Sequence, residues 1–429
     1  MGSSVLQVFL ESFAAMFKVA LICSIGIACS FYPSKYPIIT PDIIKGLSRL
    51  MNMVLIPALI LYALGSTVSI PLLARFGILI LLSLIVMFIS YSNVYAFKWL
   101  HEDDSNLFKA VLVSVGSPNS IGFPLLVMKS LCEDELVNAD YNSSSDLCFQ
   151  EVSSMMFVYS IGWHLVYWSY GVPMLKTLSQ SEQSEESFSK RMVNNLILSP
   201  CMMAIYIAIL IGIIPNFQDL LFKVPSVLRP FGSAITTLSE PVVCTNTLIM
   251  AASLAQVIIV LKRKYDTEKL SSENQITTIT FSPINQSNKI EGVEDIFHYP
   301  SLPVEIDIPD QTENYSKLDI KPNTEFNIPR PRTILVMLIC RLIIPPLLML
   351  VVMEIFLAMG LVPRHERLMR LLVVIESSAP SAQLIIVSLN QIGNSQIASG
   401  IAYMYIFQYL GSIFTVTLWA TIGLSLIYL

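Results

Sequence analysis

The sequence predicts an all-α membrane protein with ten transmembrane helices, arranged as two inverted five-helix repeats that include two crossed, proline-broken helices. Three observations support this prediction. The 429 residues are 54% hydrophobic and only 13% charged, with a mean hydropathy of +0.65, whereas soluble domains carry about 25% charged residues. Apolar stretches of about 20 residues, long enough to cross a bilayer, recur along the chain. Two of these stretches carry a proline among small polar residues.

The predicted spans are mostly bounded by charged or turn residues and cover 5–31, 43–67, 74–98, 107–131, 153–177, 192–215, 231–259, 334–360, 367–390 and 398–428. We expect the first span to be retained, because the N-terminal segment lacks the basic region of a cleavable signal peptide. The first repeat occupies 1–179, a short linker 180–191, and the second repeat 192–260 and 332–429. The segment 261–331 is rich in Pro, Asp and Glu, which predicts a disordered loop between the seventh and eighth helices.

Lysine and arginine near the span ends indicate the orientation, because cytosolic loops of membrane proteins are enriched in both. If both termini face outward, most of these residues lie on the cytosolic side. The segment 261–331 is then a cytosolic loop. The same topology places Cys132, Cys148 and the sequon at Asn142 in one outside loop. Disulfide formation and glycosylation are both expected on that side. The alternative is two free thiols and an unused sequon, and we regard the loop sequons at Asn285 and Asn314 as chance matches.

Prolines also indicate an internal repeat. An odd number of spans in each half forces the second half to be inverted in the membrane. Pro57 and Pro241 fall at matching places in the second and seventh spans, and Pro118 and Pro380 do so in the fourth and ninth. We therefore expect the fourth and ninth spans to be equivalent helices of opposite orientation.

These two spans contain "GSPNSIGFPLL" at 116–126 and "SAPSAQLIIV" at 378–387. Non-helical backbone at membrane depth is tolerated only where it is buried in protein or lines a cavity. If both helices break, the half-helices that follow direct their partially positive N-termini to one point, which favours an anion. The breaks carry no carboxylate to hold a bare cation, and a plain proline kink is the alternative. The predicted substrate-binding residues are Pro118, Asn119, Ser120, Pro380, Ser381 and Gln383.

Five stretches carry a family resemblance in the right order: "LSRLMNMVLIPALILYALGSTVS", "PNSIGFPLL", "ICRLIIPPLLML", "APSAQLIIVSLNQIG" and "AYMYIFQYLGSIFTVTLWA". Together they resemble the auxin efflux carrier superfamily, which includes the PIN-FORMED and PIN-LIKES transporters of plants. The resemblance implies a scaffold part, a moving part around two crossed helices, and transport of a small organic anion such as indole-3-acetic acid. We expect Asn52 and Pro57, in the first of these stretches, to support the binding site, together with Pro241 at the matching place in the seventh span. This sequence departs from the family's pattern in two ways. Its long loop follows helix seven, whereas the loop of the plant carriers follows helix five, and Ser381 does not repeat the amide of Asn119.

Ionisable residues inside spans are candidates for function, because each is costly at membrane depth. Glu376 lies four residues before Pro380, where loss of solvation favours its neutral form, so it is the candidate for proton coupling. The alternatives are a permanent structural pair with Arg341 and potential-driven uniport with Glu376 as a bystander. We interpret His164 in the fifth span as a packing histidine.

The sequence therefore predicts a secondary transporter in contact with the lipid bilayer. A transporter-like sensor that signals through its long loop and a sodium-coupled organic anion carrier remain as alternatives. The sequence contains no nucleotide-binding, zinc or nucleophile motif, so we expect no enzyme activity, cofactor, metal or nucleic acid partner. The sequence leaves open whether the protein forms a homodimer. The candidate locations are the endoplasmic reticulum, another endomembrane and the plasma membrane.

Overall fold

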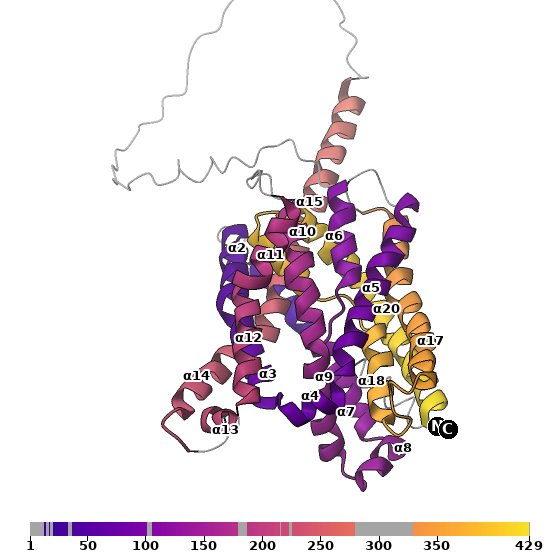
Figure 1. Cartoon of the computed structure of the whole chain (residues 1–429). Coiled ribbons are helices and arrows are strands. Elements are labelled where there is room, and N and C mark those ends of the chain that lie inside the picture. The colour runs from indigo at the N-terminus through magenta and orange to yellow at the C-terminus, as the bar shows by residue number, and fades with distance from the viewer. Residues whose placement is uncertain are drawn as a thin grey trace, which may run out of the picture. The chain divides into compact units, whose positions relative to one another are not determined.

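The computed structural model describes residues 13, 17, 20–32, 37–100, 105–178, 187–214, 216–222, 225–278 and 329–428 (Figure 1). The chain forms two compact units, residues 1–258 with 328–429 and residues 259–327. Regular structure in the described residues is helical, with one isolated antiparallel bridge. The predicted all-α class is therefore confirmed for the part of the chain that the structure describes.

Within the described residues, five helical stretches are long and apolar enough to cross a membrane: Pro41–Thr67, Ile78–Ala96, Arg229–Ile259, Pro331–Ala358 and Ser395–Tyr428. A sixth forms if Phe188–Leu198 and Pro200–Ile213, bent by 44°, count as one span. These stretches correspond to the predicted spans two, three, seven, eight, ten and six. Shorter helices occupy the described parts of predicted spans one, four and nine. The fifth contains the 22-residue helix Ser145–Val166, which is not among these stretches, so the total of ten spans stays a prediction.

The first half contains seven helices that are important for the site. Several of them begin at a side-chain cap or a proline. Thr40 and Ser69 accept N–H groups of the first turns that follow them, and Ser144 does the same further on. Such caps satisfy donors that have no partner inside the helix. The helices are α2 (Pro41–Leu50), α3 (Ile56–Thr67), α4 (Ile70–Phe76), α5 (Ile78–Ala96), α6 (Ser105–Gly116), α7 (Gly122–Cys132) and α9 (Ser145–Val166).

The second half begins within the predicted linker, because α11 starts at Phe188, inside the range 180–191. Ser199 then caps α12 at Pro200, which is why the chain bends between these two helices. The remaining helices are α11 (Phe188–Leu198), α12 (Pro200–Ile213), α13 (Phe217–Phe222), α14 (Arg229–Ser239), α15 (Val242–Thr278), α16 (Pro331–Leu338), α17 (Ile344–Ala358), α18 (Arg367–Ser378), α19 (Leu384–Gln391) and α20 (Ser395–Tyr428).

One boundary of the predicted disordered loop is wrong. Helix α15 continues to Thr278, so residues 261–278 are helical rather than disordered. These residues contain no proline or glycine, and nine of the eighteen are Lys, Arg, Glu, Gln or Leu, which favour helix. Residues 279–328, with the sequons at Asn285 and Asn314, lie outside the described residues.

Three π-helical segments interrupt the spans, and each lies just before a proline. They are η1 (Met51–Leu55) before Pro57, η4 (Tyr167–Gly171) before Pro173, and η6 (Ile339–Ile343) before Pro345. Proline cannot donate to the carbonyl four residues earlier, and its ring crowds that carbonyl. A single wider turn accommodates the proline without ending the helix.

The first compact unit contains two groups of helices. In one group α3 packs against α12 and α14, and in the other α5 packs against α6 and α9 while α18 packs against α17 and α20 (Figure 1). The short helix α19 contacts both α20 and α2. The two proline-broken spans, α6–α7 and α18–α19, therefore lie beside the boundary between the groups.

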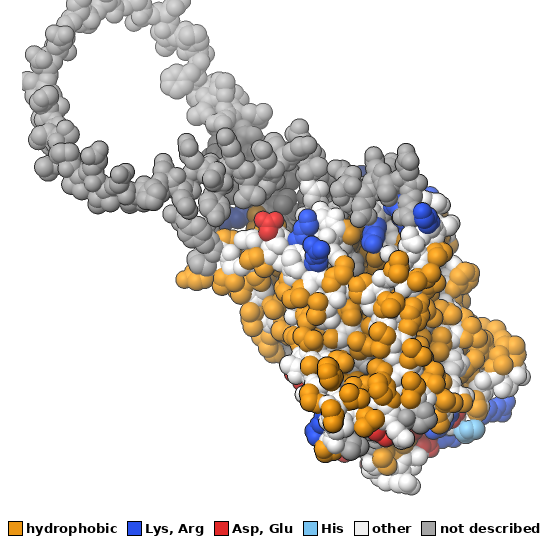
Figure 2. All heavy atoms as spheres, turned by 60° about the vertical axis from the view of Figure 1, so that its left-hand side comes forward, with side chains coloured by type: hydrophobic (Ala, Val, Ile, Leu, Met, Phe, Trp, Pro, Cys, Tyr) orange, Lys and Arg blue, Asp and Glu red, His pale blue; other side chains and the backbone are white. Residues whose placement is uncertain are grey.

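Charged side chains gather at the two ends of this unit, and hydrophobic side chains cover the surface between them (Figure 2). At one end Arg75 contacts Glu151 and Glu366 at 2.9 Å each. The hydrogen bond with Glu366 raises the pKa of Arg75 above its ordinary value. At the other end Lys176 contacts Asn195 at 3.4 Å. The first set belongs to predicted outside segments and the second to predicted inside segments, while the side that faces the cytosol stays a prediction.

Candidate functional site

The fourth span is broken at Pro118, as its sequence predicts. Helix α6 ends at Gly116 and α7 begins at Gly122. The Asn119 side chain spans the gap, because its Oδ1 accepts the Gly122 N–H at 3.1 Å and its Nδ2 donates to the Tyr409 hydroxyl at 3.3 Å. Asn119 therefore caps the second half-helix and ties it to α20.

The ninth span is broken at Pro380, and the two breaks pair with each other. Pro118 and Ser381 form the antiparallel bridge. The Asn119 N–H donates to the Pro380 carbonyl at 2.7 Å, and the Ala382 N–H donates to the Ser117 carbonyl at 2.9 Å. Backbone groups released by each proline thus find partners in the other break, which a lone kinked helix could not provide.

Arg341 satisfies the carbonyl groups at the end of α18. Its side chain is fully buried, and it donates to the Ala379 carbonyl at 2.6 Å, the Glu376 carbonyl at 3.2 Å and the Ser90 hydroxyl at 3.1 Å. A cation is favourable at a helix C-terminus, where the unpaired carbonyls carry partial negative charge. This arrangement explains how α18 can end inside the protein.

The small polar residues around the second break are less important than the sequence suggested. The Ser377 and Ser378 hydroxyls bond carbonyls of their own helix, at 2.8 and 2.9 Å. Side chains of α20 support the break instead. The Tyr409 hydroxyl donates to the Ser381 carbonyl at 2.9 Å and the Tyr405 hydroxyl to the Ala382 carbonyl at 3.0 Å. The sequence contains these tyrosines, but only the packing of α20 reveals their role.

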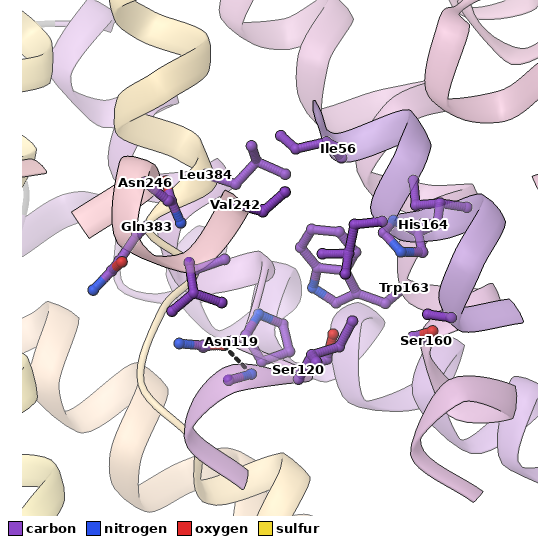
Figure 3. A pocket seen from close by; sticks show the side chains of 18 of the residues that line it. Ile56, Asn119, Ser120, Ser160, Trp163, His164, Val242, Asn246, Gln383 and Leu384 are labelled. Carbon is purple, nitrogen blue, oxygen red and sulfur yellow. Dashed lines mark hydrogen bonds between the residues drawn. The ribbon is translucent and has the colours of Figure 1, made fainter. Parts of the chain in front are cut away.

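A cavity of about 140 Å³ lies where the two breaks meet α3, α9 and α15 (Figure 3). The N-terminal ends of both half-helices, around Gly122 and Leu384, contribute to its wall. Apolar side chains of α3 and α15 form much of the rest, including Ile60 and Val242. None of the described lining residues is charged. The site is therefore neutral and mostly apolar, with a few polar groups.

The structure brings four of the predicted binding residues to this cavity: Pro118, Asn119, Ser120 and Gln383. It does not bring Pro380 or Ser381, which are buried in the bridge behind the lining.

The supporting residues also lie away from the lining. The Asn52 amide donates to the Gln391 side chain at the end of α19. Pro57 lies in the first turn of α3, and Pro241 separates α14 from α15.

Sequence reasoning missed four polar residues of the lining: Ser160, Trp163, His164 and Asn246. Three of them share one face of α9, because positions i, i+3 and i+4 lie together on a helix. That spacing was the available signal. The interpretation of His164 as a packing residue is incomplete, since it lines the cavity. Its Nδ1 accepts the Trp168 indole N–H at 3.3 Å, so the proton of the neutral ring lies on Nε2.

Glu376 lies outside the cavity lining, fully buried in α18. Neither carboxyl oxygen has a hydrogen-bond partner among the described residues, and the same holds for the Tyr159 hydroxyl. Arg341 and Tyr159 are its electrostatic neighbours. A buried carboxyl group without partners is unfavourable when ionised.

The loop at the far end of α7 is closed covalently. Cys132 and Cys148 form a disulfide with a Cα–Cα distance of 5.6 Å. Asn142 is exposed within that loop and adopts a left-handed backbone conformation, with φ of 53°. Glycosylation of Asn142 stays a prediction.

The helical fold and the membrane-length apolar helices indicate an integral membrane protein, with a cavity at its paired helix breaks. A family model described as membrane transport protein matches residues 12–272, which is more than half of the chain. The chain therefore belongs to this family, the auxin efflux carrier family. No curated protein matches the chain significantly.

Proposed function

We propose that the protein is a secondary transporter that moves a small, auxin-like organic anion by alternating access around the paired breaks. The observation that carries the proposal is the cavity at the N-terminal ends of α7 and α19, where no lining residue that the structure describes is charged. Helix N-termini favour negative charge through their partial positive ends and free N–H groups. A neutral site of this kind can bind and release a monovalent anion without a fixed ion pair.

The chemistry of the lining supports an amphipathic ligand. Apolar side chains such as Ile60 and Val242 suit a flat or aliphatic body, while Asn119 and Gln383 offer amide groups at the break side. Pockets for small ligands commonly combine apolar walls with a few placed polar groups. A carboxylate attached to an apolar ring, as in indole-3-acetate, has this combination.

The proposed architecture is a ten-helix inverted repeat with two parts. The helices α2, α3, α12, α14 and α15 form the scaffold, and the helices around the two breaks form the moving part. Support comes from the antiparallel pairing of Pro118 with Ser381 and from the location of the cavity between the two groups. Rigid-body movement of one part against the other would expose the same site to each side in turn.

Glu376 is proposed to couple transport to protons. Support comes from its place four residues before Pro380 and from the lack of hydrogen-bond partners for its carboxyl oxygens within the described structure. Protonation removes a negative charge close to the anion site. Proton and anion would then favour each other's binding, and this coupling is reciprocal.

Purified protein reconstituted into sealed vesicles tests the function directly. We expect saturable uptake of radiolabelled indole-3-acetate, with competition by other small carboxylates and no requirement for sodium. Binding without net flux would favour the sensor, and flux only with sodium would favour the sodium-coupled carrier. Absence of both binding and flux for a panel of apolar carboxylates contradicts the proposal.

A further inference from the structure

Trp163 lines the candidate site and has a buried donor without a partner among the described residues. Its side chain is only 4% exposed and lines the cavity. The indole Nε1 has no hydrogen-bond partner among the described residues. Figure 3 shows the ring between Ser120 on one side and Ile56 on the other. Buried polar groups in folded proteins are nearly always paired, so an unpaired one indicates a missing partner.

The other tryptophans make this observation specific. The chain has four, all within the described residues, and Trp99 is exposed. Of the three buried ones, Trp168 donates to His164 and Trp419 donates to the Leu342 carbonyl at 2.9 Å. Of these three, only Trp163 lacks a partner within the described part of the chain, and it is the one that lines the cavity. The chain therefore pairs its buried indole N–H groups except at the proposed binding site.

The Trp163 ring is held in place by its neighbours. It stacks on Tyr167 with ring centroids 4.8 Å apart and an interplanar angle of 19°. The Tyr167 hydroxyl is in turn bonded to Ser388 at 2.8 Å and to the Leu384 carbonyl at 3.3 Å, both on α19. His164 packs edge-on against the ring at 4.9 Å. The donor is therefore preorganised and cannot easily turn toward another acceptor.

We propose that Trp163 is a substrate-binding residue whose indole N–H donates a hydrogen bond to the carboxylate of the transported anion, while its ring forms one wall of the cavity. The proposal rests on the proposed function and names a specificity determinant for it. An N–H group is a donor only, so it favours a ligand with an acceptor oxygen. A hydrogen bond to an ionised acceptor is stronger than one to a neutral acceptor, so Trp163 should select carboxylates over their esters.

The variant Trp163→Phe keeps an aromatic wall and removes the donor. The probes are radiolabelled indole-3-acetate and, as a competitor without the charged carboxylate, its methyl ester. We expect indole-3-acetate to bind about 10- to 100-fold more weakly to the variant, the range for loss of a hydrogen bond to a charged group. Ester binding should change less than about threefold, because a neutral ester gains little from the donor.

Trp419→Phe is the matched control, because it also removes a buried indole N–H but lies in α20 away from the cavity lining. It should bind both probes like the wild type. The Trp163 Nε1–H resonance in ¹⁵N-tryptophan-labelled wild-type protein supplies a second measurement that requires no folded variant. That resonance should move when the acid is added and move much less with the ester.

Three results would overturn the proposal. One is wild-type affinity for the acid in folded Trp163→Phe protein, and another is a Trp163 resonance that does not respond to the acid. Both leave the transport function intact. The third is a wild-type protein that binds no carboxylate at all, which contradicts the proposed function together with this role of Trp163.

Discussion

Single residues at the breaks have structural tasks as well as proposed binding tasks, and Asn119 shows how the two can be separated. Its Oδ1 caps α7 through the Gly122 N–H, and one N–H of its amide contacts Tyr409. The second N–H of the amide remains available for a ligand. Substitutions of Asn119 therefore affect both ligand binding and stability, and separate measurements of the two distinguish its binding task from its structural task.

Asn119→Asp retains an oxygen for the Gly122 N–H but places a carboxylate where an anion is proposed to bind. We expect much weaker binding of indole-3-acetate together with lower thermal stability, because the bond to Tyr409 loses its donor and a carboxylate is costly at membrane depth. Asn119→Ala should weaken binding by about 1–3 kcal/mol and, through loss of the cap, lower stability by about 1 kcal/mol. Ligand binding and thermal unfolding in detergent measure the two effects. Wild-type affinity in well-folded Asn119→Ala protein excludes Asn119 from the binding site.

Glu376 is the second single residue whose role can be tested, and Glu376→Gln mimics its protonated form. In the wild type we expect uptake of the anion to increase as the external pH falls, because protonation removes a negative charge near the site. The variant should still bind the anion, but its flux should no longer respond to a pH gradient. Vesicle uptake at several imposed gradients measures this response. A full pH response in the variant, or no response in the wild type, makes Glu376 structural.

At the scale of elements, α19 is tied to the scaffold at one end of the cavity. Asn390 on α19 donates to the Ser253 hydroxyl on α15 at 2.8 Å, and the Gln391 side chain accepts from Asn52. Thr247 contacts Gln383 nearer the break at 3.3 Å. These bonds join the two helix groups on the predicted cytosolic side, so they are expected to break when that side opens.

Removal of these bonds should favour the conformation that is open to the predicted cytosolic side. In the double variant Asn390→Ala with Gln391→Ala, we expect a cysteine introduced at Ser120 to react several-fold faster with a membrane-impermeant reagent added from that side. The same introduced cysteine without the two substitutions is the control, in a background without the native free cysteines. Equal reaction rates would show that these bonds do not hold the cavity closed.

The disulfide between Cys132 and Cys148 connects the end of α7 to α9 across a sequence separation of 16. A loop of that length gives a stabilisation of about 3 kcal/mol when it is cross-linked. We therefore expect Cys132→Ser with Cys148→Ser to lower the thermal unfolding temperature while leaving the cavity residues in place. Maleimide labelling of denatured, unreduced wild-type protein provides the direct check. Labelling of both cysteines would contradict the disulfide.

At the scale of the whole molecule, the orientation in the membrane decides which end of the cavity each compartment reaches. The basic residues at the span ends predict that 261–331 is cytosolic and that the Asn142 loop faces the lumen or the exterior. Protease on the cytosolic side of sealed vesicles should cut the chain within 261–331, and a glycosidase should shift its mass if Asn142 is modified. Complete protection of 261–331 on that side would reverse the predicted topology.

The sequence predicts the helical class of this protein because the formation of membrane-spanning helices is governed by one strong signal. Apolar stretches of sufficient length must form helices in a lipid environment, where backbone groups have no other partners. The prolines at 118 and 380 located both breaks for the same reason, since each removes a backbone donor at membrane depth. The helical continuation of α15 to Thr278 was missed, because the composition of the whole segment concealed a locally helical beginning.

The sequence by itself determined the helical class, the two breaks and part of the lining, with Pro118, Asn119, Ser120 and Gln383 named from local pattern alone. Only the tertiary structure decided that the breaks pair, that Arg341 and Tyr409 satisfy them, and that Trp163 faces the cavity. The physical reason is the range of the interactions. Helix formation and interruption depend on neighbouring residues, whereas these partners are separated from the breaks by tens to hundreds of residues and meet only through packing.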